Sequence, residues 1–93
     1  MSRYAAGRRA EWRTMRVMEA AGYVCTRSSS SKGPWDVVAV SSTDIALIQV
    51  KQGKTRPGKA ERDLLLEVRR PPCARVLLHY WPPRSREPEV EEL

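Results

Sequence analysis

The sequence predicts a single α/β domain in which a mixed β-sheet is flanked by helices. Three observations predict this class: apolar residues recur at helical spacing near the N-terminus, a β-branched-rich stretch follows at 35–51, and a second helical segment precedes an apolar run at 74–81. The expected order is helix, three strands, helix, strand. We place the domain at residues 1–81 and expect residues 82–93, rich in Pro, Arg and Glu, to be disordered.

The first helix is predicted for residues 4–21, in which Trp12, Met15 and Met18 recur at helical spacing. Glu11 belongs to the same face, because it precedes Met15 by four positions and Met18 by seven. A carboxylate on a face that points toward the sheet needs a partner. A solvated glutamate at the edge of the apolar stripe is the alternative.

A β-hairpin is predicted for residues 35–51, with its turn at two polar residues. This turn places Asp36 opposite Gln49, with Cβ atoms roughly 5 Å apart. Lys51 projects from the same face as Gln49, because side chains alternate along a strand. A carboxylate, an amide oxygen and an ammonium group therefore meet at one end of the hairpin. An ordinary Asp–Lys pair at the open end of a hairpin is the alternative.

The remaining elements follow from shorter patterns. Residues 23–27 form a predicted strand that enters a loop of small polar residues at 28–34, which a phosphate backbone can approach closely; a plain linker is the alternative. A helix is predicted for residues 59–70, ended by two prolines, and a last strand for residues 74–81, covered on both faces. The residues expected to point inward from this second helix are Ala60, Leu64, Leu65 and Val68.

The charge of the chain indicates a polyanionic partner. The net charge is +6, and the last twelve residues hold two arginines and four glutamates, so residues 1–81 carry +8. A domain this basic suits nucleic acid. An arginine-rich surface that only keeps the protein soluble is the alternative.

Other classes of function lack support in the sequence. Cys25 and Cys73 are far apart and His79, the single histidine, lies in an apolar run, so neither a zinc site nor a thiol nucleophile is indicated. We find no signal peptide and no run of about 18 apolar residues. We therefore expect a cytoplasmic, nucleoid-associated protein with no membrane partner.

The hairpin cluster belongs to a longer constellation that spans Gly7 to Lys51, about half of the chain. In this constellation the sequence resembles the PD-(D/E)xK nuclease superfamily and, within it, the archaeal-type Holliday junction resolvases. The resemblance implies a restriction-endonuclease-like core and an enzyme that hydrolyses DNA. It is carried by Gly7 to Glu11 at the start of the first helix, Gly22-Tyr23, Arg27-Ser28, Gly33-Pro34, Asp36 and Gln49-Val50-Lys51.

The resemblance also implies roles for individual residues. Glu11, Asp36, Gln49 and the carbonyl group of Val50 would bind Mg²⁺, or Mn²⁺ in its place, and Lys51 would be the catalytic lysine. The other candidates lie in the serine-rich loop and among the basic residues. Ser30 and Ser31 are further catalytic candidates that would touch the scissile strand, and DNA contacts are expected from Arg8, Arg9, Arg27, Ser28, Ser29, Lys32, Lys54 and Arg56.

The chemistry explains why oxygen ligands are wanted here. Phosphodiester hydrolysis needs a hard cation that polarises the phosphoryl group, and oxygen ligands suit Mg²⁺ or Mn²⁺. Gln49 stands where the family usually has a second acid, so this is a QxK variant that keeps an oxygen ligand and loses a negative charge. We therefore expect a higher magnesium requirement or a preference for manganese. Trp12 is a second departure, since a basic residue usually follows the helix glutamate.

These patterns together predict a metal-dependent, structure-specific endonuclease that cuts four-way DNA junctions in recombination and repair. Two equal cuts imply a twofold homodimer, with candidate contacts at residues 64–66 and 76–81. Two alternatives stay open. One is an Mrr-like or repair endonuclease that acts on duplex DNA, for which Gln49 is the supporting feature. The other is a catalytically inactive DNA-binding module of the same fold.

Overall fold

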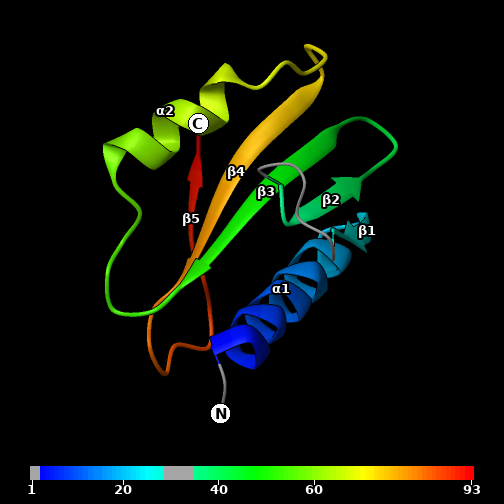
Figure 1. Ribbon diagram of the computed structural model, residues 1–93. Helices are drawn as coiled ribbons and strands as arrows, with labels where there is room; N and C mark the ends of the chain where they lie inside the picture. The colour runs from blue at the N-terminus through cyan, green and yellow to red at the C-terminus, as the bar shows by residue number, and fades with distance from the viewer. Residues whose placement is uncertain (1–2, 29–34) are drawn as a thin grey trace.

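The computed structural model describes residues 3–28 and 35–93, which form two helices and five strands (Figure 1). One sheet contains the strands in the order β1-β2-β3-β4-β5, in which β3 and β4 are parallel and all other neighbours are antiparallel. The predicted class, an α/β fold with a mixed sheet flanked by helices, is confirmed. The elements are α1 (Arg3–Ala20), β1 (Val24–Arg27), β2 (Val37–Val40), β3 (Ile45–Gln52), α2 (Lys59–Glu67), β4 (Ala74–Trp81) and β5 (Glu89–Glu92).

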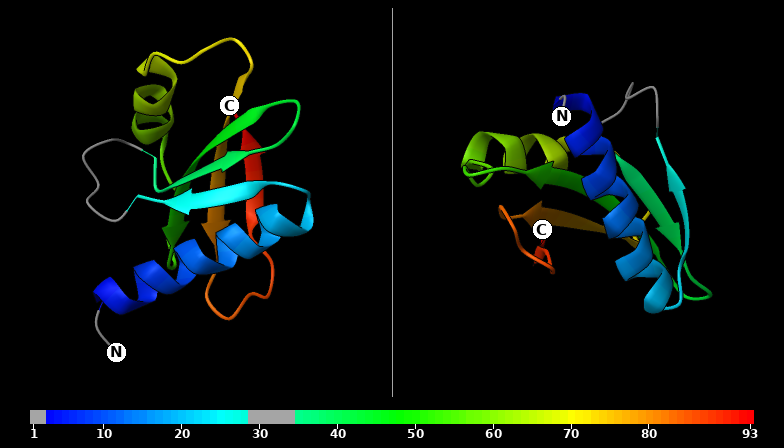
Figure 2. Two further views of the ribbon diagram at one scale, coloured as in Figure 1. Left: turned by 90° about the vertical axis from the view of Figure 1, so that its right-hand side faces the viewer. Right: turned by 90° about the horizontal axis from the view of Figure 1, so that it is seen from below.

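The two helices pack on different faces of the sheet (Figure 2). Leu65 of α2 packs with Val76 and Leu78 of β4, whereas Leu77 between them belongs to the cluster on the α1 side. This division follows from the alternation of side chains along β4. The α1 cluster consists of Ala10, Met15, Met18, Val37, Ala39, Ala46, Ile48, Val50, Leu77 and Trp81.

The hairpin of β2 and β3 has the predicted register. Val37 pairs with Ile48, and continuing this register by one residue places Asp36 opposite Gln49. The N–H group of Asp36 donates a hydrogen bond to the carbonyl oxygen of Ile48 at 2.9 Å. Strand β3 continues to Gln52, beyond the start of β2, and pairs there with β4. Among the described residues, β2 therefore offers no strand partner to the last residues of β3.

A buried polar network joins α1 to β4. The hydroxyl oxygen of Thr14 accepts a hydrogen bond from Nε1 of Trp81 at 2.8 Å and lies 3.3 Å from Nδ1 of His79. Thr14 and His79 are almost fully buried, and burial lowers the pKa of His79 to about 4. The imidazole is therefore neutral in the folded protein at pH 7.

Acid is expected to destabilise the protein through this histidine. Because its pKa is lower in the folded state than in the unfolded state, the unfolded chain takes up the proton first, and stability falls as the pH drops from about 6.5 toward 4. The loss in the free energy of unfolding across this pH range is about 3 kcal/mol. Urea unfolding of wild type and His79→Gln across this range measures it. A wild-type slope that equals the variant's would contradict a buried neutral histidine.

Residues 82–93, which the sequence predicts to be disordered, instead include strand β5. This strand pairs antiparallel with β4, and the N–H group of Leu93 donates to the carbonyl oxygen of Val76 at 2.9 Å. Each of its three glutamates binds an arginine of the preceding domain, which explains how an acidic segment is held on a basic body. The pairs are Glu89 with Arg56, Glu91 with Arg62 and Glu92 with Arg75.

Helix α2 differs from its prediction in length and in the face it buries. It ends at Glu67 because Val68 already has an extended conformation, ahead of the prolines at 71 and 72. Leu65 alone is buried, whereas Leu64 is 63 % exposed, Ala60 is exposed and Val68 is half-buried. The prediction that all four residues point inward was wrong, because α2 has only nine residues and so short a helix buries few side chains.

In the part of the chain that the structure describes, neither helix combines the length and the apolar character that crossing a membrane requires.

Candidate active site

Asp36 lies at the end of β2, where its carboxylate takes the place of a missing strand partner of β3. Its Oδ2 atom accepts a hydrogen bond from the backbone N–H of Val50 at 2.9 Å and another from the side-chain amide of Gln49 at 3.1 Å. Burial raises the pKa of Asp36, while the hydrogen bond from Val50 and the charge of Lys51 lower it. The carboxylate is thus fixed in position but poorly solvated.

Gln49 and Lys51 project from the face of β3 that lies opposite α1. Ile48 and Val50 pack in the α1 cluster, so the residues that alternate with them point to the α2 side. The Nζ atom of Lys51 lies 3.5 Å from the Glu61 carboxylate of α2. Because its charge also lowers the pKa of Asp36, the ammonium group acts on both carboxylates.

Glu11 approaches the same carboxylate from α1. Its Oε1 atom accepts a hydrogen bond from Arg27 of β1 at 3.1 Å, in an ion pair whose side chains are 18 and 19 % exposed. Burial raises the pKa of Glu11, the bond with Arg27 lowers it, and the negative charge of Asp36 raises it. The carboxylates of Glu11 and Asp36 are therefore close enough for their charges to interact. Glu11 approaches from α1, whereas Lys51 lies on the face of the sheet opposite α1.

The oxygen donors at this end of the hairpin suit a hard cation. Two partly buried carboxylates repel each other and are partly shielded from solvent. A divalent ion between them would offset both the repulsion and the loss of solvation. Gln49 presents its amide N–H to Asp36, so it would offer its oxygen to a cation after the amide group turns over. Among the described residues, no group of three or more His, Cys, Asp or Glu side chains could hold a metal ion. Such an ion would depend on the amide and on the Val50 carbonyl.

The structure describes only some of the predicted DNA contacts. The loop residues Ser29, Ser30, Ser31 and Lys32 lie outside the described residues. The N–H group of Ser28 donates to the carbonyl oxygen of Asp36 at 2.9 Å, which ties the start of that loop to the site. Arg27 pairs with Glu11. Arg8, Arg9 and Lys54 are exposed residues.

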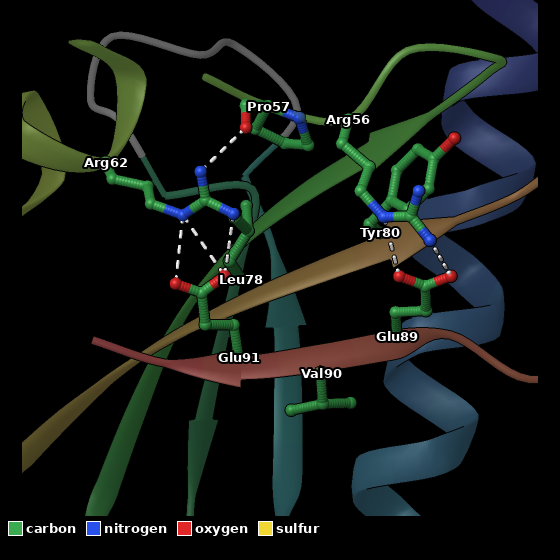
Figure 3. A pocket seen from close by; sticks show the side chains of 8 residues that line it. All are labelled: Arg56, Pro57, Arg62, Leu78, Tyr80, Glu89, Val90 and Glu91. Carbon is green, nitrogen blue, oxygen red and sulfur yellow. Dashed lines mark hydrogen bonds and ion pairs between the residues drawn. The ribbon is translucent and has the colours of Figure 1, made fainter. Parts of the chain in front are cut away.

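Arg56 has a partner that its sequence position did not suggest. Its guanidinium group binds Glu89 of β5 through two hydrogen bonds of 2.9 and 2.7 Å and lies 5.5 Å from the ring centre of Tyr80 (Figure 3). This pair lines one side of a cavity of about 230 Å³, and the pair of Arg62 with Glu91 lines another. A phosphate group would have to displace Glu89 before it could bind Arg56.

Glu61 is the site neighbour that sequence reasoning missed. It lies in the first turn of α2 and contacts Lys51, ten positions earlier in the chain. The helix pattern of residues 59–70 was visible, but which side of the sheet this helix would cover was not. No local sequence signal therefore pointed to Glu61.

Comparison with known proteins gives a result in structure alone. No protein family model matches the chain, and no curated protein matches it. Among solved structures it is similar to Hjc, a Holliday junction resolvase of the archaeal hyperthermophile Archaeoglobus fulgidus, with a TM-score of 0.68 and 23 % sequence identity. The likeness covers 95 % of this chain and 71 % of Hjc. This chain therefore has the fold of that resolvase.

Proposed function

We propose that this protein is a metal-dependent, structure-specific DNA endonuclease that resolves four-way junctions by phosphodiester hydrolysis. One observation carries the proposal: the carboxylate of Asp36 accepts hydrogen bonds from Gln49 and Val50 at the open end of the hairpin. Its charge also interacts with those of Lys51 and Glu11. The fold shared with Hjc and the basic charge of the chain support it. The resemblance to the PD-(D/E)xK superfamily agrees with both.

In this proposal each residue has a distinct role. A bound Mg²⁺ or Mn²⁺ would polarise the phosphoryl group and lower the pKa of an attacking water. Asp36, fixed by the N–H of Val50, would hold the ion together with Glu11. Lys51 would orient the water or stabilise the negative charge that develops on phosphate, once its contact with Glu61 gives way. Arg27 holds Glu11 in place and offsets part of the rise that burial causes in the pKa of Glu11.

The deciding experiment compares DNA substrates under identical conditions. The protein is incubated with Mg²⁺ or Mn²⁺ and with either a four-way junction or a linear duplex of the same sequence. Paired nicks confined to the junction are the expected result. Cutting of the duplex would favour the second candidate, an Mrr-like or repair endonuclease, for which Gln49 is the supporting feature. Tight binding without cleavage would indicate an inactive DNA-binding module.

Gln49→Glu is expected to lower the Mg²⁺ concentration needed for half-maximal cleavage by about tenfold. The substitution adds a negative charge beside the proposed ion and removes the need for the amide to turn over. Metal titrations of cleavage measure the change. The matched control is Gln52→Glu, which adds the same charge at an exposed position on the same strand. An equal shift in both variants would show a long-range charge effect and contradict a ligand role for residue 49.

We further propose a twofold homodimer, because two symmetry-related strands of a junction must be cut. Leu64 and Leu66 of α2, 63 and 46 % exposed, support this proposal as apolar residues that the monomer leaves uncovered. Sedimentation equilibrium tests it: a monomer at micromolar concentration would contradict the proposal, and Leu64→Lys with Leu66→Lys is expected to dissociate a dimer.

A further inference from the structure

The exposed side of α1 carries a shallow hollow with an unusual lining. The hollow measures about 520 Å³, and it is lined by four arginines and one tryptophan, with no acidic residue among them. The arginines recur along one side of the helix, so the positive charge forms a stripe. The lining residues are Arg8, Arg9, Trp12, Arg13 and Arg16.

Trp12 leaves much of its large apolar surface open to water. Its side chain is 47 % exposed, whereas Trp81 is 3 % exposed and buried under α1. A half-exposed indole among cations contributes little to the packing of the monomer, since tryptophan side chains are usually mostly buried and their N–H group usually has a hydrogen-bond partner. Val17, 39 % exposed on the same helix, is not among the residues that line the hollow.

The hollow is joined to the candidate active site through one side chain. The guanidinium group of Arg27 lies 5.5 Å from the ring centre of Trp12 and 3.1 Å from the carboxylate of Glu11. Trp12 follows Glu11 in the chain, and the indole and the carboxylate both lie next to the same cation. A ligand bound in the hollow would therefore approach the site from α1.

We propose that this hollow binds an unpaired nucleotide of the DNA substrate, with the base stacked on Trp12 and the neighbouring phosphates held by Arg9 and Arg16. The lining fits a nucleic acid because it combines an aromatic ring for a base with cations for the backbone. In continuous duplex the faces of the bases are covered, so the nucleotide must be unstacked. A second copy of this chain is not the expected occupant, because the proposed dimer contact lies on α2 and four arginines line this hollow. The inference rests on the proposed DNA-directed function and specifies the part of the DNA that is bound.

Binding measurements in EDTA test the stacking directly. The probes are a single-stranded oligothymidylate, a duplex of the same length and inorganic polyphosphate. Trp12→Leu is expected to bind oligothymidylate about tenfold more weakly, with less than a twofold change for the other two probes. Trp12→Phe retains a ring and should stay within about threefold of wild type. Circular dichroism shows whether each variant is folded.

Two controls separate stacking from charge. Val17→Ala removes an exposed apolar side chain from the same helix and should bind all probes like wild type. Arg9→Gln with Arg16→Gln should weaken binding to all three probes. The slope of the logarithm of the binding constant against the logarithm of the salt concentration should become shallower by about two. Quenching of tryptophan fluorescence by oligothymidylate should decrease in Trp12→Phe. Any quenching that remains is expected from Trp35, which is partly buried, because Trp81 is buried.

The outcomes distinguish this inference from the proposed nuclease. If Trp12→Leu binds oligothymidylate like wild type, or loses all three probes equally, the hollow does not stack a base and the inference is overturned. If junctions are cut normally while that result is found, the inference alone fails. If Trp12→Leu loses the oligothymidylate selectively but no DNA is cut, the inference stands and the nuclease proposal fails.

Discussion

Asp36→Asn is expected to abolish cleavage, lowering the rate on the order of 10³-fold or more, while DNA binding persists. The change keeps the size of the side chain and an oxygen acceptor for the N–H of Val50, but it removes the charge that would hold a divalent ion. Removing a negative charge beside the phosphate should leave binding unchanged or strengthen it. Single-turnover cleavage of a junction and gel-shift titration in EDTA measure the two effects.

The same substitution is expected to stabilise the metal-free protein at neutral pH. Burial raises the pKa of Asp36 above its ordinary value, so the folded state holds the proton more tightly than the unfolded state. The charged carboxylate therefore costs stability once the pH exceeds the unfolded value of 3.8, and asparagine removes that cost. Thermal unfolding in EDTA at pH 7 measures the gain, and Mg²⁺ should raise the melting temperature of wild type only.

The control for Asp36 is Asp63→Asn, which removes an exposed carboxylate of α2 that pairs with Lys59 at the surface. It should cut and bind like wild type, because exposed i,i+4 pairs contribute little. If Asp36→Asn cuts normally, or if both variants lose activity together, Asp36 is not a ligand of a catalytic ion.

Lys51→Ala is expected to reduce cleavage by about 10² to 10³-fold at saturating DNA and metal. The ammonium group is a donor on the face of β3 that also carries Gln49, and its charge lowers the pKa of Asp36. Its loss should therefore slow the chemical step and leave junction binding within about threefold of wild type. Single-turnover rates at several protein concentrations separate the two quantities.

Two further variants define the role of this lysine. Lys51→Arg should recover little activity, because a planar guanidinium group differs from a compact ammonium group in shape and in hydration. Lys59→Ala removes a cation of α2 that is 90 % exposed, and it should behave like wild type. A loss in Lys51→Ala that appears wholly in DNA affinity would contradict a role in catalysis.

Local patterns predicted the hairpin end of the site correctly. The two-residue turn and the alternation of side chains determine which residues of β2 and β3 oppose each other, so Asp36 meets Gln49 as predicted. The same alternation places Lys51 on the face of Gln49. Such relations need only a few consecutive residues and no knowledge of what packs above the sheet.

Contacts between distant elements were beyond the reach of the sequence. The pairing of Glu11 with Arg27 depends on how α1 lies across β1, and that of Lys51 with Glu61 depends on which face α2 covers. Neither is encoded by a local pattern, since each requires the docking of a helix on a sheet. For the same reason Arg27 was assigned to phosphate alone.

The C-terminal strand shows most clearly what local sequence patterns cannot predict. Residues 82–93 have the composition of a disordered tail, and by themselves they cannot bury enough apolar surface to fold. They become β5 because β4 offers an unpaired edge and three arginines lie within reach of Glu89, Glu91 and Glu92. The sequence by itself determined the fold class and the hairpin register, because these follow from short-range periodicity. Only the tertiary structure decided which charges are paired and which remain exposed, because ion pairing depends on distances between segments that are far apart in the chain.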